Sequence, residues 1–404
     1  MQKTPFYSYK LGTLPKGCQL CVQGSKVVLF LTGLCPRNCC YCPISDKKYK
    51  KDVTYADEWH IQTIKDIIKE AKLISAKGAG ITGGDPLCRL NRTVLCIKTL
   101  KTEFGKKFHI HLYTSLNLVN EKNLRCLYEA GLDEIRFHLD LDNDKLWNKL
   151  KLALIYDWDV GVELPVILKK EKNLKKIVLF LKDINDNSRN KIEFLNLNEL
   201  EIADNKVNKL LKLGYKTKNL LSYAVDGSEE LALRLLKFVK KNKIKLNVHY
   251  CTATLKDKVQ VGNRIKRRAK NVKKDFDEVT GYGTLIRGAI YLENLKPGFN
   301  YRKNLIKILK NNKLKNNYIK RLNLTKNNIK KDFYIKNNLI YIDNQKLRIL
   351  TSVTEIKKIR DEINKNFFKK ICRDKELLDN KELFLAIVEE YPTQDQLELS
   401  VEFL

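Results

Sequence analysis

The chain lacks the features that would place it in a membrane or outside the cell. Its first ten residues, MQKTPFYSYK, contain no apolar stretch of the kind found in secretory signal peptides. No run of about 18 consecutive apolar residues occurs anywhere in the 404 residues. A single methionine indicates compositional bias and decides nothing further. These absences favour a cytoplasmic protein, long enough for more than one domain.

Acidic residues are also scarce relative to basic ones. The sequence has 47 Asp and Glu against 78 Lys and Arg, a formal net charge of +31. This excess suits a polyanionic partner such as RNA, because lysine contacts phosphates. It suits equally the lysine-, isoleucine- and asparagine-rich composition of a heat-adapted source. The charge leaves both interpretations open.

Cysteine is abundant by contrast, with 11 residues. Disulfide frameworks belong to small secreted chains, so metal ligands or buried free thiols are expected here. Four cysteines fall within residues 31–43 (LTGLCPRNCCYCP), where Cys35, Cys39 and Cys42 have the spacing C-x3-C-x2-C. The preceding apolar residues 27–31 indicate a strand, so the cysteines are expected on a loop that follows it.

This spacing favours an iron–sulfur cluster over other metal sites. Three thiolates on a tight loop suit a [4Fe–4S] cluster, which is held by clustered soft ligands. With only three protein ligands, one iron stays open to another molecule. Zinc would need a second cysteine pair or suitably spaced histidines, and none follows this loop. Cys40, out of register, is expected to pack rather than bind.

A second signal is the segment ITGGDPL at residues 81–87. Gly83 and Gly84 end an expected strand, and paired glycines let the backbone approach a ligand closely. Alone, Gly-Gly-Asp-Pro is an ordinary turn. It gains weight because it lies one strand–helix unit after the cysteine loop.

From residue 26 onward apolar runs alternate with amphipathic segments, a pattern typical of βα units and a parallel sheet. Six strands are expected near residues 26–31, 80–82, 108–114, 134–139, 160–167 and 192–197, with a further extended run at 245–250. Helices are expected at residues 61–77, 92–103, 122–130 and 228–241. No internal repeat is evident.

With both motifs in place, residues 26–250 resemble the radical S-adenosylmethionine (radical SAM) superfamily. GLCPRNCCYCP, GITGGDPL, HIHLYT and GLDEIRFH are similar to an archaeal group described as related to pyruvate formate-lyase activating enzyme. The resemblance implies an α/β fold, a partial (β/α)6 TIM-like barrel with its chemistry at the C-terminal ends of the strands. It implies an enzyme whose [4Fe–4S] cluster, reduced by one electron, cleaves SAM to methionine and a 5′-deoxyadenosyl radical that abstracts hydrogen from a substrate. A reductase or ferredoxin-type partner would supply the electron.

The resemblance also implies roles for matched residues. The cysteines implied to bind the cluster are Cys35, Cys39 and Cys42. The turn Gly83-Gly84-Asp85 would border the SAM amino group, with Asp85 where the family usually has Glu. Thr114 and Ser115 would lie near the SAM ribose. Further polar residues on the expected strands are candidates for binding SAM or substrate: His109, His111, Arg136, His138, Glu163, Asn196 and Asn198.

A second group of cysteines has two interpretations. Cys18 and Cys21 precede the first strand, and Cys251 ends the extended run after the sixth, so all three could converge at the open side of a partial barrel. They could bind an auxiliary iron–sulfur cluster or a zinc ion, with His249 as a further ligand. Alternatively they are free thiols. The remaining cysteines are expected to be core thiols: Cys88, Cys96, Cys126 and Cys372.

Composition divides the chain into four parts. These are an N-terminal cysteine-pair extension (1–24), the barrel (25–255), a connector (256–300) and a small basic α+β appendage (301–404). The connector is expected to hold a basic helix at 264–274 and a β-hairpin at 281–293. The appendage is expected to hold an ordered basic helical segment at 302–337, strands at 339–342 and 346–350, and helices at 354–366 and 374–382.

The substrate remains open between hypotheses. An RNA base is favoured by the net charge and by the basic residues 264–274, although these have no interleaved aromatic platform. A protein or peptide, modified in the manner of an activating enzyme, is the alternative. A non-enzymatic electron carrier or scaffold is a third reading, against which the Gly-Gly-Asp-Pro turn argues. No membrane partner is expected, and the pattern does not predict an oligomeric state.

Overall fold

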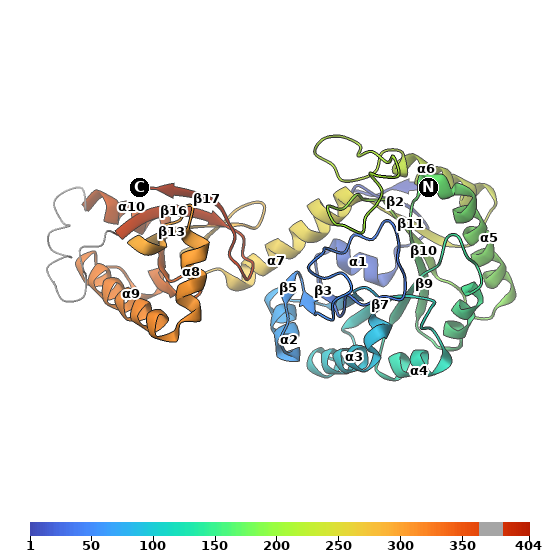
Figure 1. Ribbon diagram of the computed structural model, residues 1–404, viewed down its shortest axis with the longest axis horizontal. Coiled ribbons are helices and arrows are strands. Elements are labelled where there is room, and N and C mark those ends of the chain that lie inside the picture. The colour runs from blue at the N-terminus through green and yellow to red at the C-terminus, as the bar shows by residue number, and fades with distance from the viewer. Residues whose placement is uncertain (363–382) are drawn as a thin grey trace. The chain divides into compact units, whose positions relative to one another are not determined.

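The computed structural model describes residues 1–362 and 383–404, which divide into two compact units between Arg264 and Ile265 (Figure 1). Residues 256–264 of the expected connector belong to the first unit, and the rest of the connector belongs to the second. Residues 1–24 also belong to the first unit, because β2 (Tyr9–Leu11) pairs with its sheet. No helix in the described part of the chain is both long and apolar enough to cross a membrane.

The first unit is a partial βα barrel. Its sheet has the order β1-β2-β11-β10-β9-β8-β7-β6-β3-β4-β5. The parallel strands are β3 (Lys26–Phe30), β6 (Gly78–Thr82), β7 (His109–Ser115), β8 (Glu134–His138), β9 (Asp159–Pro165), β10 (Phe194–Asn198) and β11 (Asn247–Cys251). The short strands β1 (Gln2–Lys3), β4 (Tyr55–Ala56) and β5 (Trp59–His60) complete it. The predicted barrel is confirmed, and the extended run after the sixth strand proves to be a further parallel strand, β11.

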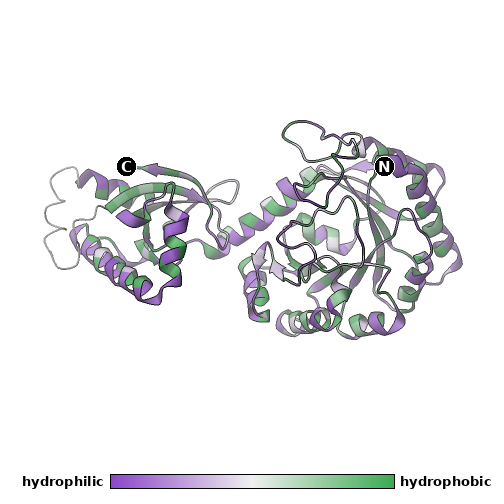
Figure 2. Cartoon of the chain, in the orientation of Figure 1, coloured by the Kyte–Doolittle hydropathy of each residue, from purple (hydrophilic) through white to green (hydrophobic). Residues whose placement is uncertain are grey.

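Helices cover the outer face of this sheet (Figure 1). They are α2 (Ile64–Leu73), α3 (Leu90–Phe104), α4 (Glu121–Glu129), α5 (Glu171–Asn187) and α6 (Ser228–Lys241). Figure 2 shows their hydrophobic residues turned inward and their hydrophilic residues outward, as expected for amphipathic helices on a core. Along β8, Ile135 and Phe137 are completely buried in the hydrophobic core, while the alternate residues Glu134 and Arg136 face the barrel interior.

A short helix, α1 (Lys16–Val22), lies within the ring of strands (Figure 1). The sequence patterns did not predict it. Gly17 permits this position, because a Cβ there would lie 2.5 Å from Arg136 Nη2 and 2.8 Å from Glu134 Oε1. The Gly17 backbone N–H donates to Glu134 Oε2 at 2.9 Å, which fixes the start of the helix against β8. The Cys18–Cys21 pair is therefore carried into the barrel.

The second unit is a separate antiparallel sheet with its own core. Its strands are β12 (Glu278–Val279), β13 (Leu285–Leu292), β14 (Ile340–Asp343), β15 (Arg348–Thr351), β16 (Leu383–Glu390) and β17 (Glu398–Phe403). Its helices include α8 (Tyr301–Lys310), α9 (Asn312–Asp332) and α10 (Val353–Glu362), while α7 (Gly262–Val272) begins in the first unit.

Some expectations for this part of the chain need adjustment. The Lys/Asn-rich segment forms two helices, α8 and α9, rather than one. The hairpin consists of β12 and β13, so it begins before residue 281. Strands β16 and β17 were not predicted. The helix expected at 374–382, the end of the helix expected at 354–366, and Cys372 lie outside the described residues. Among the other expected core thiols, Cys96 is buried, whereas Cys88 and Cys126 are only half-buried.

Candidate cofactor site at the mouth of the barrel

The cysteine loop, residues 31–43, follows β3 and rests on the turn that follows β6. The Gly84 backbone N–H donates to Thr32 O, and that of Asp85 donates to Leu34 O, both at 2.7 Å. A Cβ at Gly84 would lie 2.3 Å from Leu34 O, and one at Gly83 would lie 2.4 Å from Thr32 O. The two motifs found in the sequence therefore form one unit, which requires glycine at both positions.

The three predicted cluster ligands line a cavity of about 640 Å³ at the C-terminal ends of the strands. Its lining includes Cys35, Cys39, Cys42, Gly83, Gly84, Thr114 and Ser115. Burial raises the pKa of the Cys35 thiol to about 11 and also raises that of Cys42. Bound iron would displace these thiol protons. The soft donor set beside a side-chain-free glycine turn fits a three-thiolate iron–sulfur cluster with an adjoining ligand.

Tyr41, directly before Cys42, ties the cysteine loop to the end of β8. Its hydroxyl lies 2.9 Å from Nε2 of His138. Burial raises the pKa of Tyr41 and lowers that of His138 to about 4, so this pair is neutral at ordinary pH. Arg37 adds a second link, donating to the carbonyl of His138 at 3.1 Å and pairing with Asp140 at 3.2 Å.

Asp85 holds the glycine turn to the end of β7. Its fully buried carboxylate accepts from the Leu87 backbone N–H (3.1 Å), the Thr114 hydroxyl (2.8 Å), and the Ser115 backbone N–H (3.0 Å) and hydroxyl (2.6 Å). Burial raises the pKa of Asp85, and these hydrogen bonds oppose the rise. The donors thus occupy both carboxylate oxygens, and Thr114 and Ser115 direct their hydroxyl protons toward Asp85 rather than toward a ligand.

A network of polar side chains centred on Arg136 lies inside the barrel, where Arg136, Glu163 and Asn198 line the cavity. Arg136 is fully buried and bonds Glu134 at 2.5 Å, Glu163 at 2.8 Å and the Tyr113 hydroxyl at 3.1 Å. Glu163 also accepts from the side-chain amides of Asn196 at 3.0 Å and Asn198 at 2.8 Å. The structure thus brings the predicted candidates Arg136, Glu163, Asn196 and Asn198 together, and each is hydrogen-bonded, as expected for buried polar groups.

The sequence patterns did not single out Lys26, although a lysine at the start of an apolar strand is unusual. Its ammonium group contacts Ala79 O at 3.0 Å and the Nδ1 atoms of His109 and His111 at 2.9 and 2.5 Å. Burial lowers the pKa of Lys26 to about 8 and that of His109 to about 2. Both imidazoles therefore face the buried Lys26 side chain through Nδ1.

One further group of side chains in this part of the barrel could hold a metal ion. His109, Glu134 and Asp159 have ligand atoms within 4.8 Å of one another. Nε2 of His109 faces Glu134 Oε2 at 3.5 Å. The third member, Asp159, is exposed, and exposed acidic groups often lie near other ligand atoms without an ion, so we assign no ion here.

In the second cysteine group, Cys18 and Cys251 are buried and Cys21 is half-buried. Cys18 Sγ accepts from the Asn196 amide at 3.2 Å and from Arg136 Nη2 at 3.5 Å, while Cys251 packs with Val22 and Leu255. Within the described residues, neither these three cysteines nor Cys35, Cys39 and Cys42 have all their sulfur atoms within 4.8 Å of one another, so this distance does not distinguish the two sets. Burial raises the pKa of each thiol. His249 Nε2 lies 3.3 Å from the Ser8 hydroxyl.

Several cavity residues carried no signal in the sequence. They are Tyr113, Glu199, Glu201, Lys256 and Gln260, which come from strand ends and from the π-helical turn η4 (Leu255–Val261). Lys256 and Glu201 form an ion pair of 2.6 Å at the rim. Single polar residues of this kind recur throughout any chain, so only their convergence distinguishes them.

A family model and proteins of other organisms match parts of this chain. Residues 29–188 match the family model described as the radical SAM superfamily. A protein of Methanocaldococcus jannaschii, provisionally named a glycyl-radical enzyme activating enzyme, is 46% identical over 290 residues, 70% of this chain and 74% of that protein. Biotin synthase of Rickettsia felis is 31% identical over 134 residues, 32% of this chain and 40% of its own.

Two solved structures show weaker likeness. Streptococcus suis SuiB bound to S-adenosylmethionine has a TM-score of 0.37 at 12% identity, covering 56% of this chain and 49% of its own. Methylornithine synthase has a TM-score of 0.35 at 16% identity, covering 56% of this chain and 70% of its own. We therefore draw no conclusion about function from these two structures.

Proposed function

Because this chain belongs to the radical SAM superfamily, we propose that it is an activating enzyme that creates a glycyl radical on a partner protein. Family membership makes it an enzyme and implies a [4Fe–4S] cluster and SAM. The activating role is supported by the relative that shares 46% identity over 70% of this chain and carries that provisional name. Nothing in the comparisons points to an RNA base, and the net charge alone does not distinguish the two substrates.

Different residues of the cavity would hold the cluster, border SAM and limit the access of water. Cys35, Cys39 and Cys42 would hold the cluster, and the backbone of Gly83 and Gly84 would border the SAM amino group. When bound, the cluster supplies the reductive cleavage of SAM. The described chain itself holds the glycine turn through Asp85 and closes the cavity floor with the Arg136 network, which limits the access of water.

The substrate would bind at the rim of the cavity. The Lys256–Glu201 pair lines it, next to the buried Glu199, whose carboxylate accepts from the Ala253 backbone N–H at 2.8 Å. A polar rim of this kind suits a peptide segment, which offers backbone donors and acceptors at every residue.

The core of the proposal is tested by anaerobic iron–sulfur reconstitution of the wild type and of Cys39→Ala. The wild type should bind about four irons and form 5′-deoxyadenosine from SAM and dithionite, and the variant should lose both. Cys126→Ala, a half-buried cysteine on α4 that does not line the cavity, is the matched control and should keep both. Product formation by Cys39→Ala would refute the assigned ligand set.

The activating role needs its own measurement. Reconstituted enzyme, SAM and dithionite are added to an anaerobic extract of the source cells, and a glycyl-radical doublet is sought by electron paramagnetic resonance. We expect the doublet to appear on an extract protein and to require Cys39. A new modified nucleoside in the extract RNA, with no radical signal on protein, would replace this role by the RNA hypothesis.

The auxiliary metal expected at Cys18, Cys21 and Cys251 stays a prediction. It is supported only by their common location inside or beside the barrel, and the hydrogen bonds of Cys18 suit a free thiol equally. Iron and zinc counts on the wild type and on Cys18→Ala/Cys21→Ala would decide between them. About four irons and no zinc in both proteins would exclude the auxiliary site.

A further inference from the structure

The cysteine loop separates two hollows in the first unit. The inner one is the cavity that contains the glycine turn. The outer one, of about 690 Å³, is lined by Cys40, Trp147, Lys170 and Tyr215 among others, and does not include that turn. Cys39 and Tyr41 line both hollows, so the loop forms a wall between them. A partner in the outer hollow would reach Cys39, one of the assigned cluster ligands, without entering the inner cavity.

A long segment between β10 and α6, residues 199–227, borders the outer hollow; we call it the β10–α6 loop. It is bonded directly to the cysteine loop, since the Lys209 backbone N–H donates to Cys40 O at 2.7 Å and the Asn205 amide donates to Cys42 O at 3.1 Å. Its Leu210 and Leu213 line the hollow. The β10–α6 loop itself therefore lies against the backbone of Cys40 and of the assigned ligand Cys42.

The β10–α6 loop exposes apolar side chains that a free surface would not favour. Leu220 and Leu221 are fully exposed, and Leu211 and Leu213 are about half-exposed or more, at 64% and 47%. The loop is nonetheless held by its own backbone, because Lys218 N–H donates to Ala224 O at 2.9 Å. Ordered, exposed leucines gathered in one loop are typical of a protein-binding surface.

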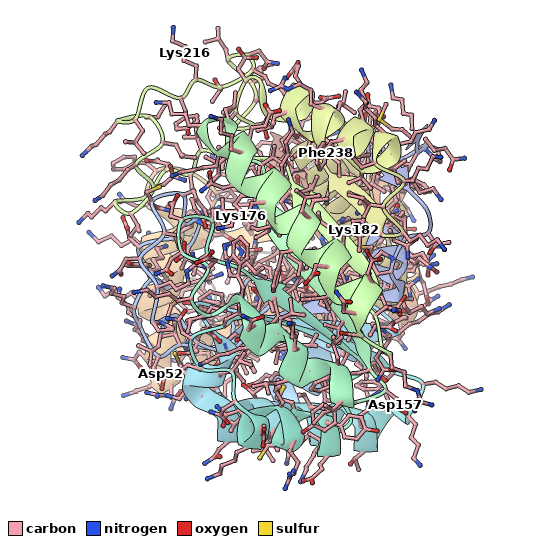
Figure 3. All side chains as sticks on the ribbon, turned by 90° about the vertical axis from the view of Figure 1, so that its right-hand side faces the viewer. Asp52, Asp157, Lys176, Lys182, Lys216 and Phe238 are labelled. Carbon is pink, nitrogen blue, oxygen red and sulfur yellow. The ribbon has the colours of Figure 1, made fainter. Side chains whose placement is uncertain are left out.

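Unpaired lysines accompany these leucines. Lys206, Lys209, Lys212 and Lys216 are exposed, and none has an ion-pair partner among the described acidic residues. Figure 3 shows Lys216 on this loop with its side chain extending outward. Lys218, by contrast, pairs with Glu199 and Glu229. The loop thus combines exposed leucines with unpaired cations, and the cations are complementary to an acidic partner.

We propose that the β10–α6 loop and the outer hollow dock a small acidic electron-donor protein that reduces the cluster. The inference rests on the proposed function, because the enzyme needs one electron for each SAM cleaved. In this step one electron leaves the reduced donor and enters the oxidised cluster, and no proton or bond is transferred. The substrate protein and SAM need the inner cavity, so the donor uses the other side of the loop. Small interfaces with charge complementarity suit transient electron-transfer pairs.

Binding tests this surface without relying on activity. Isothermal titration calorimetry would compare the wild type with Lys212→Glu/Lys216→Glu and with Leu220→Ser/Leu221→Ser, using an oxidised acidic two-cluster ferredoxin as the probe. We expect each variant to weaken binding about tenfold or more, and the wild-type affinity to fall as salt rises. Lys240→Glu/Lys241→Glu, at the far end of α6, is the matched charge control and should bind as the wild type does.

Turnover separates this inference from the proposed function. With reduced ferredoxin as the electron source, kcat/KM for ferredoxin should fall about tenfold in both loop variants, while the dithionite-driven rate of 5′-deoxyadenosine formation stays unchanged. No product from the wild type with dithionite would refute the proposed function itself. Unchanged ferredoxin binding and turnover in the loop variants would refute only the docking surface. Loss of radical transfer to the substrate protein alone would assign this surface to the substrate.

Discussion

At the scale of single residues, Asp85 shows how a buried side chain can position a binding turn without itself offering a free atom. The resemblance placed it beside the SAM amino group, and the structure places its carboxylate among four donors from Leu87, Thr114 and Ser115. The shorter Asp, where the family usually has Glu, fits a site with no exposed surface. The side chain therefore acts on the ligand through the backbone that it holds.

We predict that Asp85→Asn destabilises the first unit by about 3 kcal/mol, because the amide nitrogen would face a donor and the buried charge-assisted hydrogen bonds would be lost. Urea unfolding of the wild type and the variant measures this. Asp226→Asn, an exposed aspartate in the β10–α6 loop, should change stability by less than about 0.5 kcal/mol. Equal unfolding midpoints for wild type and Asp85→Asn would contradict the assigned role.

At the scale of elements, Asp52 joins the cysteine loop to α3. Its carboxylate accepts from the Thr32 hydroxyl at 2.9 Å, from Arg89 Nε at 2.7 Å and from Arg92 Nη1 at 2.7 Å. The hydrogen bonds from Arg92 hold its pKa far below the ordinary value. The segment that carries the cluster ligands is thus anchored on both sides, by Asp52 and by the glycine turn.

This anchor predicts a specific pH dependence. A carboxyl with a depressed folded pKa contributes stability that is complete above the unfolded pKa of about 3.9 and is lost as the pH falls toward the folded pKa. The wild type should exceed Asp52→Asn in unfolding free energy by about 2 kcal/mol at pH 6, with the difference shrinking below pH 4. Urea titrations at several pH values check this, with exposed Asp204→Asn as control. A difference that grows toward acid pH would contradict it.

At the scale of the whole molecule, the two units have separate cores, and the second is organised around buried charges. Arg348 is completely buried and bonds Glu390 at 2.6 Å, Asp343 at 3.0 Å and the Tyr291 hydroxyl at 3.0 Å. None of these residues lies in the unit that contains the cysteine loop. The stabilities of the two units should therefore be separable.

We predict two calorimetric transitions. Arg348→Ala should lower only the transition of the second unit, by about 3–5 kcal/mol, because it leaves Asp343 buried without its cation and leaves Glu390 with Arg287 alone. Reconstitution with iron and sulfide should raise only the other transition, since a bound group stabilises the unit that holds it. A single transition that responds equally to both changes would show that the units unfold together.

The sequence by itself determined the parts that depend on local pattern. The spacing of Cys35, Cys39 and Cys42, the paired glycines at 83–84 and the alternation of apolar runs are short-range features, so they identified the family and the barrel and predicted the site. Helix α6 was predicted with its observed bounds because its apolar period is regular. The strand β11 was expected as an extended run but not counted in the barrel.

Only the tertiary structure decided which distant residues meet. Helix α1 enters the barrel because Gly17 bonds Glu134, 117 positions away, and no local pattern encodes that contact. The same holds for Lys26 between its two histidines, for the four donors around Asp85 and for the loop that joins Lys209 to Cys40. Hydrogen bonds of buried polar groups depend on partners brought together by the packing of the whole sheet, so their roles follow from the fold rather than from spacing along the chain.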